Sequence, residues 1–429
     1  MKAYVFDIET DGLDPSVVHM IAIGNLKGDV RVLEDLDKAL EILDRADLLI
    51  GHNIIGYDLP VLKKLLGWSP RDDVTLFDTM IASQLLYRDL YMEERKYHPE
   101  WLEKLPPRLL GSHSLEAWGF RLGVLKDDFG KRTDWSFTEA NREEFLAYAK
   151  QDVVVTKALY DFLAPKIETY KDVFEMEQEV AKIIARQKAY GFMVDKAKAQ
   201  ELLGTYYERM EEIYEQLQQA FPPWEVITGY YKRPNSKKGI KAGDPKKTIV
   251  KFNPSSRDHI AKVLQDKYNW EPKEFTNTGK PVVNEEVLNS LDYPEAKLIA
   301  EYLKLQKLVG MLAEGSQAIL RHIKDDGRVH GSVNTLGAVS RRMTHSNPNV
   351  AQMPSDHSFR ELFIVPEGKK LVGIDASGLE LRCLAHYLAP YDKGRYTHTI
   401  LHGDIHTMNQ KAAGLATRKQ AKRFIYAFN

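Results

Sequence analysis

Two acidic residues near the start of the chain, Asp7 and Glu9, have the spacing of a metal-binding pair. They follow the apolar run 3–6 and precede the polar turn residues 10–12, a pattern typical of a buried strand that ends at a site. Side chains alternate along a strand, so both carboxylates lie on one face, about 7 Å apart. Oxygen ligands at that spacing suit Mg²⁺ or Mn²⁺, alone or as a pair. The ordinary alternative is a solvated strand end.

Three later residues could complete such a site. Residues 48–50 predict another buried strand, after which Asp58 begins a helix, where the helix dipole alone could explain an acid. Tyr148 and Asp152 are four residues apart in a helix predicted to start near residues 136–138, so they share one helical face. Each of these residues is common by itself, and only the set favours chemistry.

Composition restricts the class of protein. A chain of 429 residues predicts about two to four domains. Its 60 Lys and Arg balance its 61 Asp and Glu, so any nucleic-acid surface must be local. No apolar run is long enough to span a bilayer and Met1 leads directly into a strand, which predicts a cytoplasmic protein without membrane contact. The single cysteine, Cys383, excludes disulfides within the chain and is expected to be inert packing.

Residues 1–165 resemble the DEDD superfamily of 3′→5′ exonucleases, in the subclass that uses tyrosine. The resemblance rests on three motifs in order, at residues 7–10, 52–58 and 148–152. It implies a ribonuclease H-like α/β domain, with a mixed sheet and flanking helices. It also implies two divalent metal ions held by four acids, with a tyrosine that orients the attacking water: Asp7, Glu9, Asp58 and Asp152, with Tyr148.

Phosphodiester hydrolysis gives a reason for such a set. The reaction places extra negative charge on the phosphate, and both the attacking and the departing oxygen need stabilisation. Two metal ions about 3.5–4 Å apart provide it, and four carboxylates offset their charge.

Residues 166–330 show mainly helical periodicity and resemble the thumb of family A DNA polymerases, in particular the phage replicative branch. The basic loop 232–251 carries eight Lys or Arg and one acid, Asp244. It is predicted to be mobile and to contact DNA phosphates, Lys237 and Lys238 included, although a solvated loop without function is the alternative. The larger insertion that binds a processivity factor in some phage enzymes is short here, which argues against that partner.

Residues 331–429 resemble the first part of a family A catalytic domain, a partial α+β palm and the start of the fingers of a right-hand polymerase. The apolar run 371–374 predicts a buried strand that ends at Asp375. Residues 337–352 resemble the segment that contacts primer-template, with Ser340-Arg341 in place of the common Thr-Gly. The DNA-binding residues expected in this segment are Arg342, Asn349 and Gln352.

The same resemblance assigns roles in the polymerase site. Asp375 is the expected metal ligand, and Glu380 is expected to exclude a ribose 2′-hydroxyl. The remaining residues are expected to touch the incoming dNTP: His406, Arg418, Lys422 and Tyr426.

One departure is large. Family A enzymes need a second metal-binding aspartate in a His-Asp-Glu hairpin beyond the fingers helix, whereas this sequence ends three residues after Tyr426. We therefore expect half a polymerase site. The hypothesis is a split polymerase completed by a second polypeptide with the C-terminal part; a truncation is the alternative.

The sequence thus predicts the N-terminal portion of a DNA-directed DNA polymerase with a proofreading exonuclease. Its partners would be primer-template, single-stranded 3′ ends and dNTP, and its location the cytoplasm of a phage-infected bacterium. Two other functions stay open: a DNA-binding scaffold whose exonuclease acts only in an assembly, and a stand-alone exonuclease that processes RNA.

Overall fold

The computed structural model describes residues 1–124, 137–234 and 239–428, with side chains described as far as Ile425. Lys237, Lys238 and the side chain of Tyr426 therefore lie outside the described part. The chain divides into two compact units, Met1–Ile364 and Val365–Asn429.

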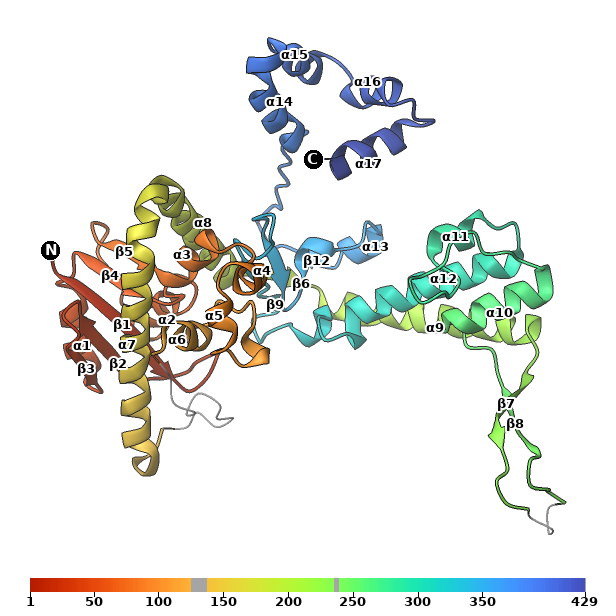
Figure 1. Ribbon diagram of the computed structural model, residues 1–429, viewed down its shortest axis with the longest axis horizontal. Helices are drawn as coiled ribbons and strands as arrows, with labels where there is room; N and C mark the ends of the chain where they lie inside the picture. The colour runs from red at the N-terminus through yellow and green to blue at the C-terminus, as the bar shows by residue number, and fades with distance from the viewer. Residues whose placement is uncertain (125–136, 235–238, 429) are drawn as a thin grey trace. The chain divides into compact units, whose positions relative to one another are not determined.

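A five-stranded mixed sheet forms the centre of the first 170 residues (Figure 1). The strand order is β3-β2-β1-β4-β5, with β1, β2 and β3 antiparallel and β1, β4 and β5 parallel. The central strand β1 is apolar where its neighbours cover it on both sides, and Val5 and Phe6 are fully buried. This confirms the predicted fold class. The strands are β1 Ala3–Thr10, β2 Val18–Asn25, β3 Val30–Leu33, β4 Leu48–Gly51 and β5 Thr75–Asp78.

Helices pack against this sheet, and the longest, α7, lies against β1, β2, β3 and β4. Two short helices follow α3, and Trp101 in the second of them is buried in an aromatic cluster with Trp118 and Tyr87. The helices are α1 Leu36–Leu43, α2 Asp58–Leu66, α3 Thr79–Leu86, α4 Leu90–Lys96, α5 Pro99–Leu102, α6 Leu115–Leu122 and α7 Arg142–Ile167.

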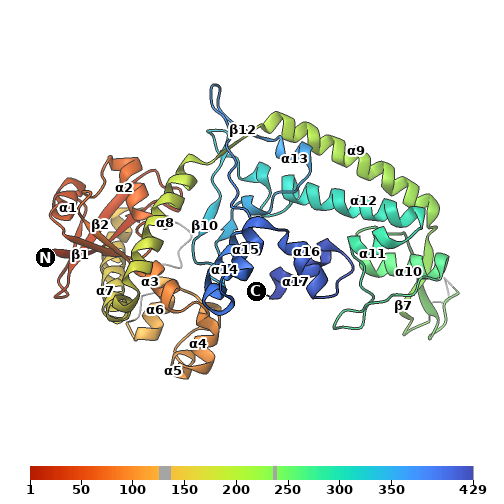
Figure 2. The ribbon, with the colours of Figure 1, turned by 90° about the horizontal axis from the view of Figure 1, so that it is seen from above.

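A second hydrophobic core lies among the helices that follow α8. Helices α9 and α12 run side by side in both views (Figures 1 and 2). Helix α10 begins after Ser256, whose side chain caps it by accepting from the backbone N–H of His259 at 3.3 Å. The helices are α8 Lys171–Tyr190, α9 Lys196–Ala220, α10 Arg257–Tyr268, α11 Glu285–Ser290 and α12 Pro294–Val309.

The basic segment is a β-hairpin in part, which corrects the prediction of a loop across 232–251. Strand β7 (Trp224–Tyr230) pairs antiparallel with β8 (Pro245–Val250), and Thr248, Ile249 and Val250 are β-branched residues that favour this pairing. Lys246 and Lys247 therefore belong to a strand of this hairpin.

Short strands complete the first unit. Strand β6 (Phe192–Val194) lies between β12 (Phe363–Ile364) and β9 (Arg328–Val329), and β10 (Ser332–Asn334) pairs with β11 (Thr344–Ser346). Helix α13 (His357–Arg360) precedes β12.

The second unit contains helices α14 Leu379–Asp392, α15 Arg395–His402, α16 Ile405–Ala412 and α17 Arg418–Phe428 (Figure 1). The strand predicted at 371–374 is wrong: this run is not in a sheet and Ile374 is 93% exposed. An apolar run gains neither ladder hydrogen bonds nor burial without a paired strand, and none pairs with it in the described part of the chain. Cys383 on α14 is also exposed, which corrects its assignment as packing. Within the described ranges, no helix is both long and apolar enough to cross a bilayer.

Candidate active site

Three carboxylates from opposite ends of the first 152 residues meet beside the sheet. Asp7 and Glu9 lie on β1, and α7 brings Asp152 to the same place. One carboxylate oxygen of each residue lies within 4.8 Å of the others. Glu9 and Asp152 are each only 5% exposed, so this is a buried acidic cluster rather than a solvated strand end.

The fourth predicted acid, Asp58, lies beside the same strand. It begins α2, as expected, and its Oδ1 accepts a hydrogen bond from the backbone N–H of Ile8 at 3.2 Å. Ile8 separates Asp7 from Glu9 in the sequence, so this bond fixes Asp58 to the strand that carries both acids. Asp58 is 3% exposed and is not one of the three carboxylates within 4.8 Å of one another.

The charge state of Asp58 reflects its surroundings. Burial raises the pKa of the Asp58 carboxyl, and the negative charges of Asp78 and Asp152 raise it further, against hydrogen bonds that lower it. A bound cation would have the opposite effect, because it favours the ionised carboxylate.

Tyr148 lies one helical turn before Asp152 on α7. Burial raises the pKa of its hydroxyl, and the charges of Asp152, Glu9 and Asp7 together with a hydrogen bond to Asp152 act in the same direction. The phenol therefore stays protonated at neutral pH. It can position a water molecule by hydrogen bonding but cannot act as a phenolate base.

Asp78, which the sequence analysis did not assign to the site, supports the loop that leads to Asp58. Its carboxylate is 1% exposed and accepts from the backbone N–H groups of Asn53 (3.0 Å) and Ile55 (3.1 Å). It also caps α3 by accepting from Met80 at 3.0 Å. In the sequence, the one indication of this role is an aspartate between a predicted strand and a predicted helix. Any N-cap aspartate has that position, so the sequence does not distinguish Asp78.

The donor set fits a hard divalent cation. Every ligand in the cluster found among the described residues is a carboxylate oxygen. Hard ions such as Mg²⁺ and Mn²⁺ prefer oxygen ligands, whereas softer metals prefer sulfur or imidazole ligands. Burial makes the cluster costly without positive charge, because like charges close together repel.

Three of the residues expected to bind DNA, Arg342, Asn349 and Gln352, lie in or just after the β10–β11 hairpin. Arg342 and Gln352 are exposed. The side chain of Asn349 accepts from the backbone N–H of Ala351 at 3.2 Å, so this residue also has a local structural role.

In the second unit, His406, Arg418 and Lys422 come together. Asp404 caps α16, accepting from the N–H of His406 at 3.1 Å, and binds Arg418 through contacts of 2.9 and 3.1 Å. Partial burial and the positive charges of Arg418 and Lys422 lower the pKa of His406, while Asp404 opposes them. Asp375 is exposed in the segment before α14, and Glu380 is exposed in the first turn of that helix.

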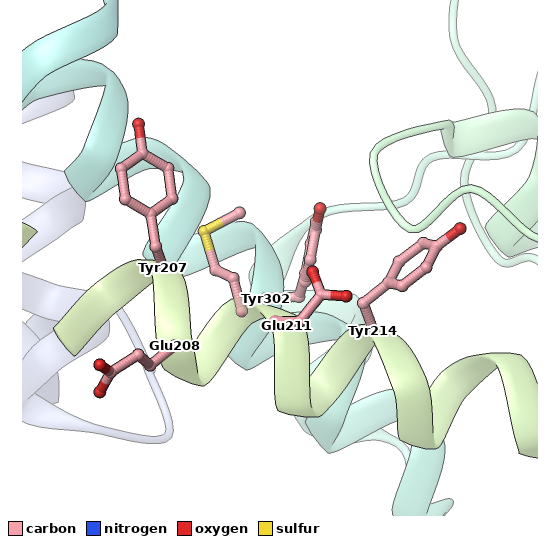
Figure 3. Close-up of a pocket in the computed structure, with 6 residues that line it drawn as sticks. Tyr207, Glu208, Glu211, Tyr214 and Tyr302 are labelled. Carbon is pink, nitrogen blue, oxygen red and sulfur yellow. The ribbon is translucent and has the colours of Figure 1, made fainter. Parts of the chain in front are cut away.

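A cavity of about 560 Å³ lies on α9 and α12, and none of the residues named above lines it (Figure 3). Its lining includes Tyr207, Glu211, Tyr214 and Tyr302. The carboxylates of the acidic cluster are not in its lining, so the cavity is separate from that site.

Comparison with known proteins agrees with the geometry. The family "3'-5' exonuclease" matches residues 1–168, and "DNA polymerase family A" matches residues 237–428. The chain is 36% identical to the DNA-directed DNA polymerase of Enterobacteria phage T3, over 92% of this chain and 69% of that protein. The DNA-directed DNA polymerase of Escherichia phage T7 is also 36% identical, over 90% of this chain and 68% of its own length.

A solved structure shares the fold. The POL domain of Pol1 from M. smegmatis, in complex with DNA primer-template and dNTP, matches with a TM-score of 0.64 and 18% identity, over 100% of this chain and 67% of that one. The present chain spans about two thirds of the length of its phage relatives. It belongs to the family A DNA polymerases and carries that family's 3′-5′ exonuclease domain, together with part of the polymerase domain.

Proposed function

We propose that the exonuclease of this family A polymerase works at the buried acidic cluster and removes nucleotides from DNA 3′ ends. The observation that carries the proposal is the meeting of Asp7, Glu9 and Asp152 within 4.8 Å. Asp58 and Tyr148 lie next to this cluster and complete the site.

The chain's own residues would prepare the reaction. Divalent ions, Mg²⁺ or Mn²⁺ and two per site, would supply positive charge at the phosphate and lower the pKa of the attacking water. Asp7, Glu9, Asp58 and Asp152 would hold them. The protonated Tyr148 hydroxyl would orient the water. A P–O bond forms to the water oxygen while the bond to the 3′ oxygen breaks, which releases a nucleoside 5′-monophosphate and a strand one nucleotide shorter.

Replacing Asp7 tests this site. We expect Asp7→Ala to reduce digestion of a labelled single-stranded DNA at least about 100-fold, because a shared metal ligand is lost. The variant should stay folded, since the substitution relieves repulsion between Asp7 and its acidic neighbours in the metal-free protein.

The matched control is Asp37→Ala, which removes an exposed acid from α1. Wild-type activity in a folded Asp7→Ala protein would contradict the proposal. A chelator should abolish wild-type digestion, and preference for an RNA 3′ end would favour the alternative of RNA processing.

For the polymerase site we propose the roles that the resemblance implies. Asp375 would bind metal, Glu380 would select the sugar, and the cationic group on α16 and α17, with Tyr426, would bind dNTP. Primer-template would contact Arg342, Asn349 and Gln352, as well as Lys237 and Lys238. The corresponding domains would be 1–165, 166–330 and 331–429.

The second polypeptide also stays a proposal. Its support is the exposed apolar run 371–374, where Leu371 is 68% and Val372 74% exposed, because a palm strand needs partners on its edges. Mixing the chain with a fragment that carries the His-Asp-Glu hairpin should restore nucleotide addition. Absence of synthesis from a well-folded mixture would count against it.

A further inference from the structure

The hairpin of residues 332–346, which we call the primer-contact hairpin, packs on the exonuclease domain. Leu336, in the turn after β10, is 6% exposed and belongs to the hydrophobic core formed by the first 174 residues. Strand β10 also lies against α8. The segment expected to contact primer-template is thus held against the core of the exonuclease domain and against α8.

The turn of this hairpin has a defined shape. A side chain at Gly337 would place its Cβ 2.0 Å from Thr344 Oγ1, so the two arms cross closely at this point. The N–H of Ala338 donates to the carbonyl of Arg342 at 3.1 Å, and that of Arg341 donates to the carbonyl of Ala338 at 2.7 Å. These bonds leave Arg341 at the end of a tight turn.

Arg341 adopts a conformation that arginine rarely takes. Its φ is 61°, in the left-handed region where glycine is favoured. A long cationic side chain in a backbone position that disfavours it calls for a contact that compensates.

That contact is with the exonuclease domain. Arg341 Nη2 donates to the carbonyl of Leu85 at 3.2 Å, in the last turn of α3, where the helix dipole is negative. Glu177 on α8 lies near enough for the guanidinium to lower its pKa, against burial, which raises it. Arg341 therefore sits where α3 and α8 meet.

The other end of α3 supports the acidic site. Asp78 caps this helix and holds the loop that leads to Asp58, and the backbone N–H of Asp78 donates to Gln178 of α8 at 2.9 Å. One short helix thus has the hairpin latched to its C-terminus and the Asp58 loop fixed to its N-terminus.

We propose that Arg341 is a positioning residue that latches the primer-contact hairpin to the exonuclease domain, and thereby sets how efficiently a base-paired 3′ end is excised. The inference rests on the proposed function of the acidic cluster. Single-stranded DNA does not need the duplex contacts of the hairpin, so only paired ends should depend on the latch.

The test uses the whole chain with Mg²⁺ and two substrates that share one 3′ sequence, a single strand and a paired primer-template. Arg341→Gly keeps the left-handed backbone and removes the guanidinium. We expect the ratio of kcat/KM on the paired end to kcat/KM on the single strand to fall about fivefold, the effect of losing one hydrogen bond of typical strength. Arg341→Lys should restore part of the ratio.

Arg321→Ala is the matched control, because Arg321 makes a similar bond to the carbonyl of Ala313 at 3.0 Å within the helical region. An unchanged or increased ratio in Arg341→Gly, or equal loss on both substrates, would overturn the inference. Failure of the wild-type chain to digest the single strand would instead overturn the proposed site, so the two failures are distinguishable. Hydrogen exchange that rises only in residues 337–344 of Arg341→Gly would confirm that the variant is folded and that the latch is released.

Discussion

The acidic residues at this candidate site differ in what surrounds their carboxylates. Asp7, Glu9 and Asp152 gather around a point where a cation fits, whereas Asp78 is surrounded by backbone N–H groups. Asp58 combines both environments, because it accepts a bond from the N–H of Ile8 and also interacts with the negative charges of Asp78 and Asp152. The partner of each carboxylate, rather than its burial, thus decides whether it can serve as a ligand.

Asp58 should make the stability of the metal-free protein depend on pH. Burial raises its pKa above the ordinary value of about 3.9, so the folded state favours the protonated carboxyl. The associated stability is present below about pH 4 and is lost as pH rises toward the raised pKa. Each unit in this window costs up to about 1.4 kcal/mol.

Thermal unfolding in a chelator should reveal this dependence. Asp58→Asn should flatten the fall in Tm above pH 4, and Asp37→Asn, on the exposed face of α1, should leave it unchanged. Saturating Mg²⁺ should oppose the fall in the wild type. Identical pH profiles for wild type and Asp58→Asn would show that the dependence does not come from burial of this carboxyl.

Asp404 should control the charge state of His406. Its negative charge opposes the lowering of the His406 pKa by burial, Arg418 and Lys422. Asp404→Ala should therefore lower that pKa further, which NMR titration of the ring can measure. Asp392→Ala, at the end of α14, serves as the control. A rise in the pKa would show that released Arg418 moves away from the ring.

At the scale of elements, α3 depends on a single side chain. Asp78→Ala would leave the N–H groups of Asn53, Ile55 and Met80 without their acceptor. We expect a loss of at least about 2 kcal/mol in urea unfolding, since both a cap and buried hydrogen bonds disappear. Exonuclease activity should also fall, because the Asp58 loop loses its support.

Asp89→Ala provides the comparison. Asp89 caps α4 through one bond to Met92 at 3.2 Å and is partly exposed, so its loss should cost about 1 kcal/mol and leave digestion unchanged. Equal effects of the two substitutions would mean that Asp78 is an ordinary cap.

Sequence predicts elements here when their signal is local. The strand before Asp7 and the face shared by Tyr148 and Asp152 follow from periodicity alone. The run 371–374 has the same apolar pattern but no strand pairs with it in the described part of the chain. The apolar pattern alone therefore cannot predict whether this run forms a strand. In β8 the neighbouring lysines indicate a solvated loop although β-branched residues follow them. The strand that pairs with β8 is β7, which lies outside the basic segment.

Tertiary contacts stay beyond sequence reasoning at the site as well. Nothing in the composition distinguishes Asp78 from other aspartates that precede a helix, and its role depends on a loop 23–25 residues earlier in the chain. The bond from Arg341 to Leu85 joins residues 256 apart. Motifs located the acids of the site, but these supporting contacts required the folded chain.

For the whole molecule, the near balance of 60 basic and 61 acidic residues makes the position of charge decisive. The β7–β8 hairpin carries two adjacent exposed lysines, Lys246 and Lys247, on β8. Binding of a duplex through this hairpin would displace counterions and weaken steeply with salt.

The double variant Lys237→Ala/Lys238→Ala should weaken duplex binding without changing sequence preference. The slope of log affinity against log salt should fall by about 0.9 for each phosphate that the variant no longer neutralises. Lys297→Ala is the control, because Lys297 on α12 donates to the carbonyl of Asn289. Fluorescence anisotropy over a salt series measures both quantities, and an unaltered slope would remove these lysines from the DNA surface.

The solitary cysteine gives an experimental handle on the second unit. Cys383 is the single thiol of all 429 residues and is exposed on α14. A maleimide dye or a nitroxide would therefore attach at one known position in the unmodified sequence. Its signal would report when a primer, a nucleotide or a completing polypeptide reaches the helices that follow Asp375.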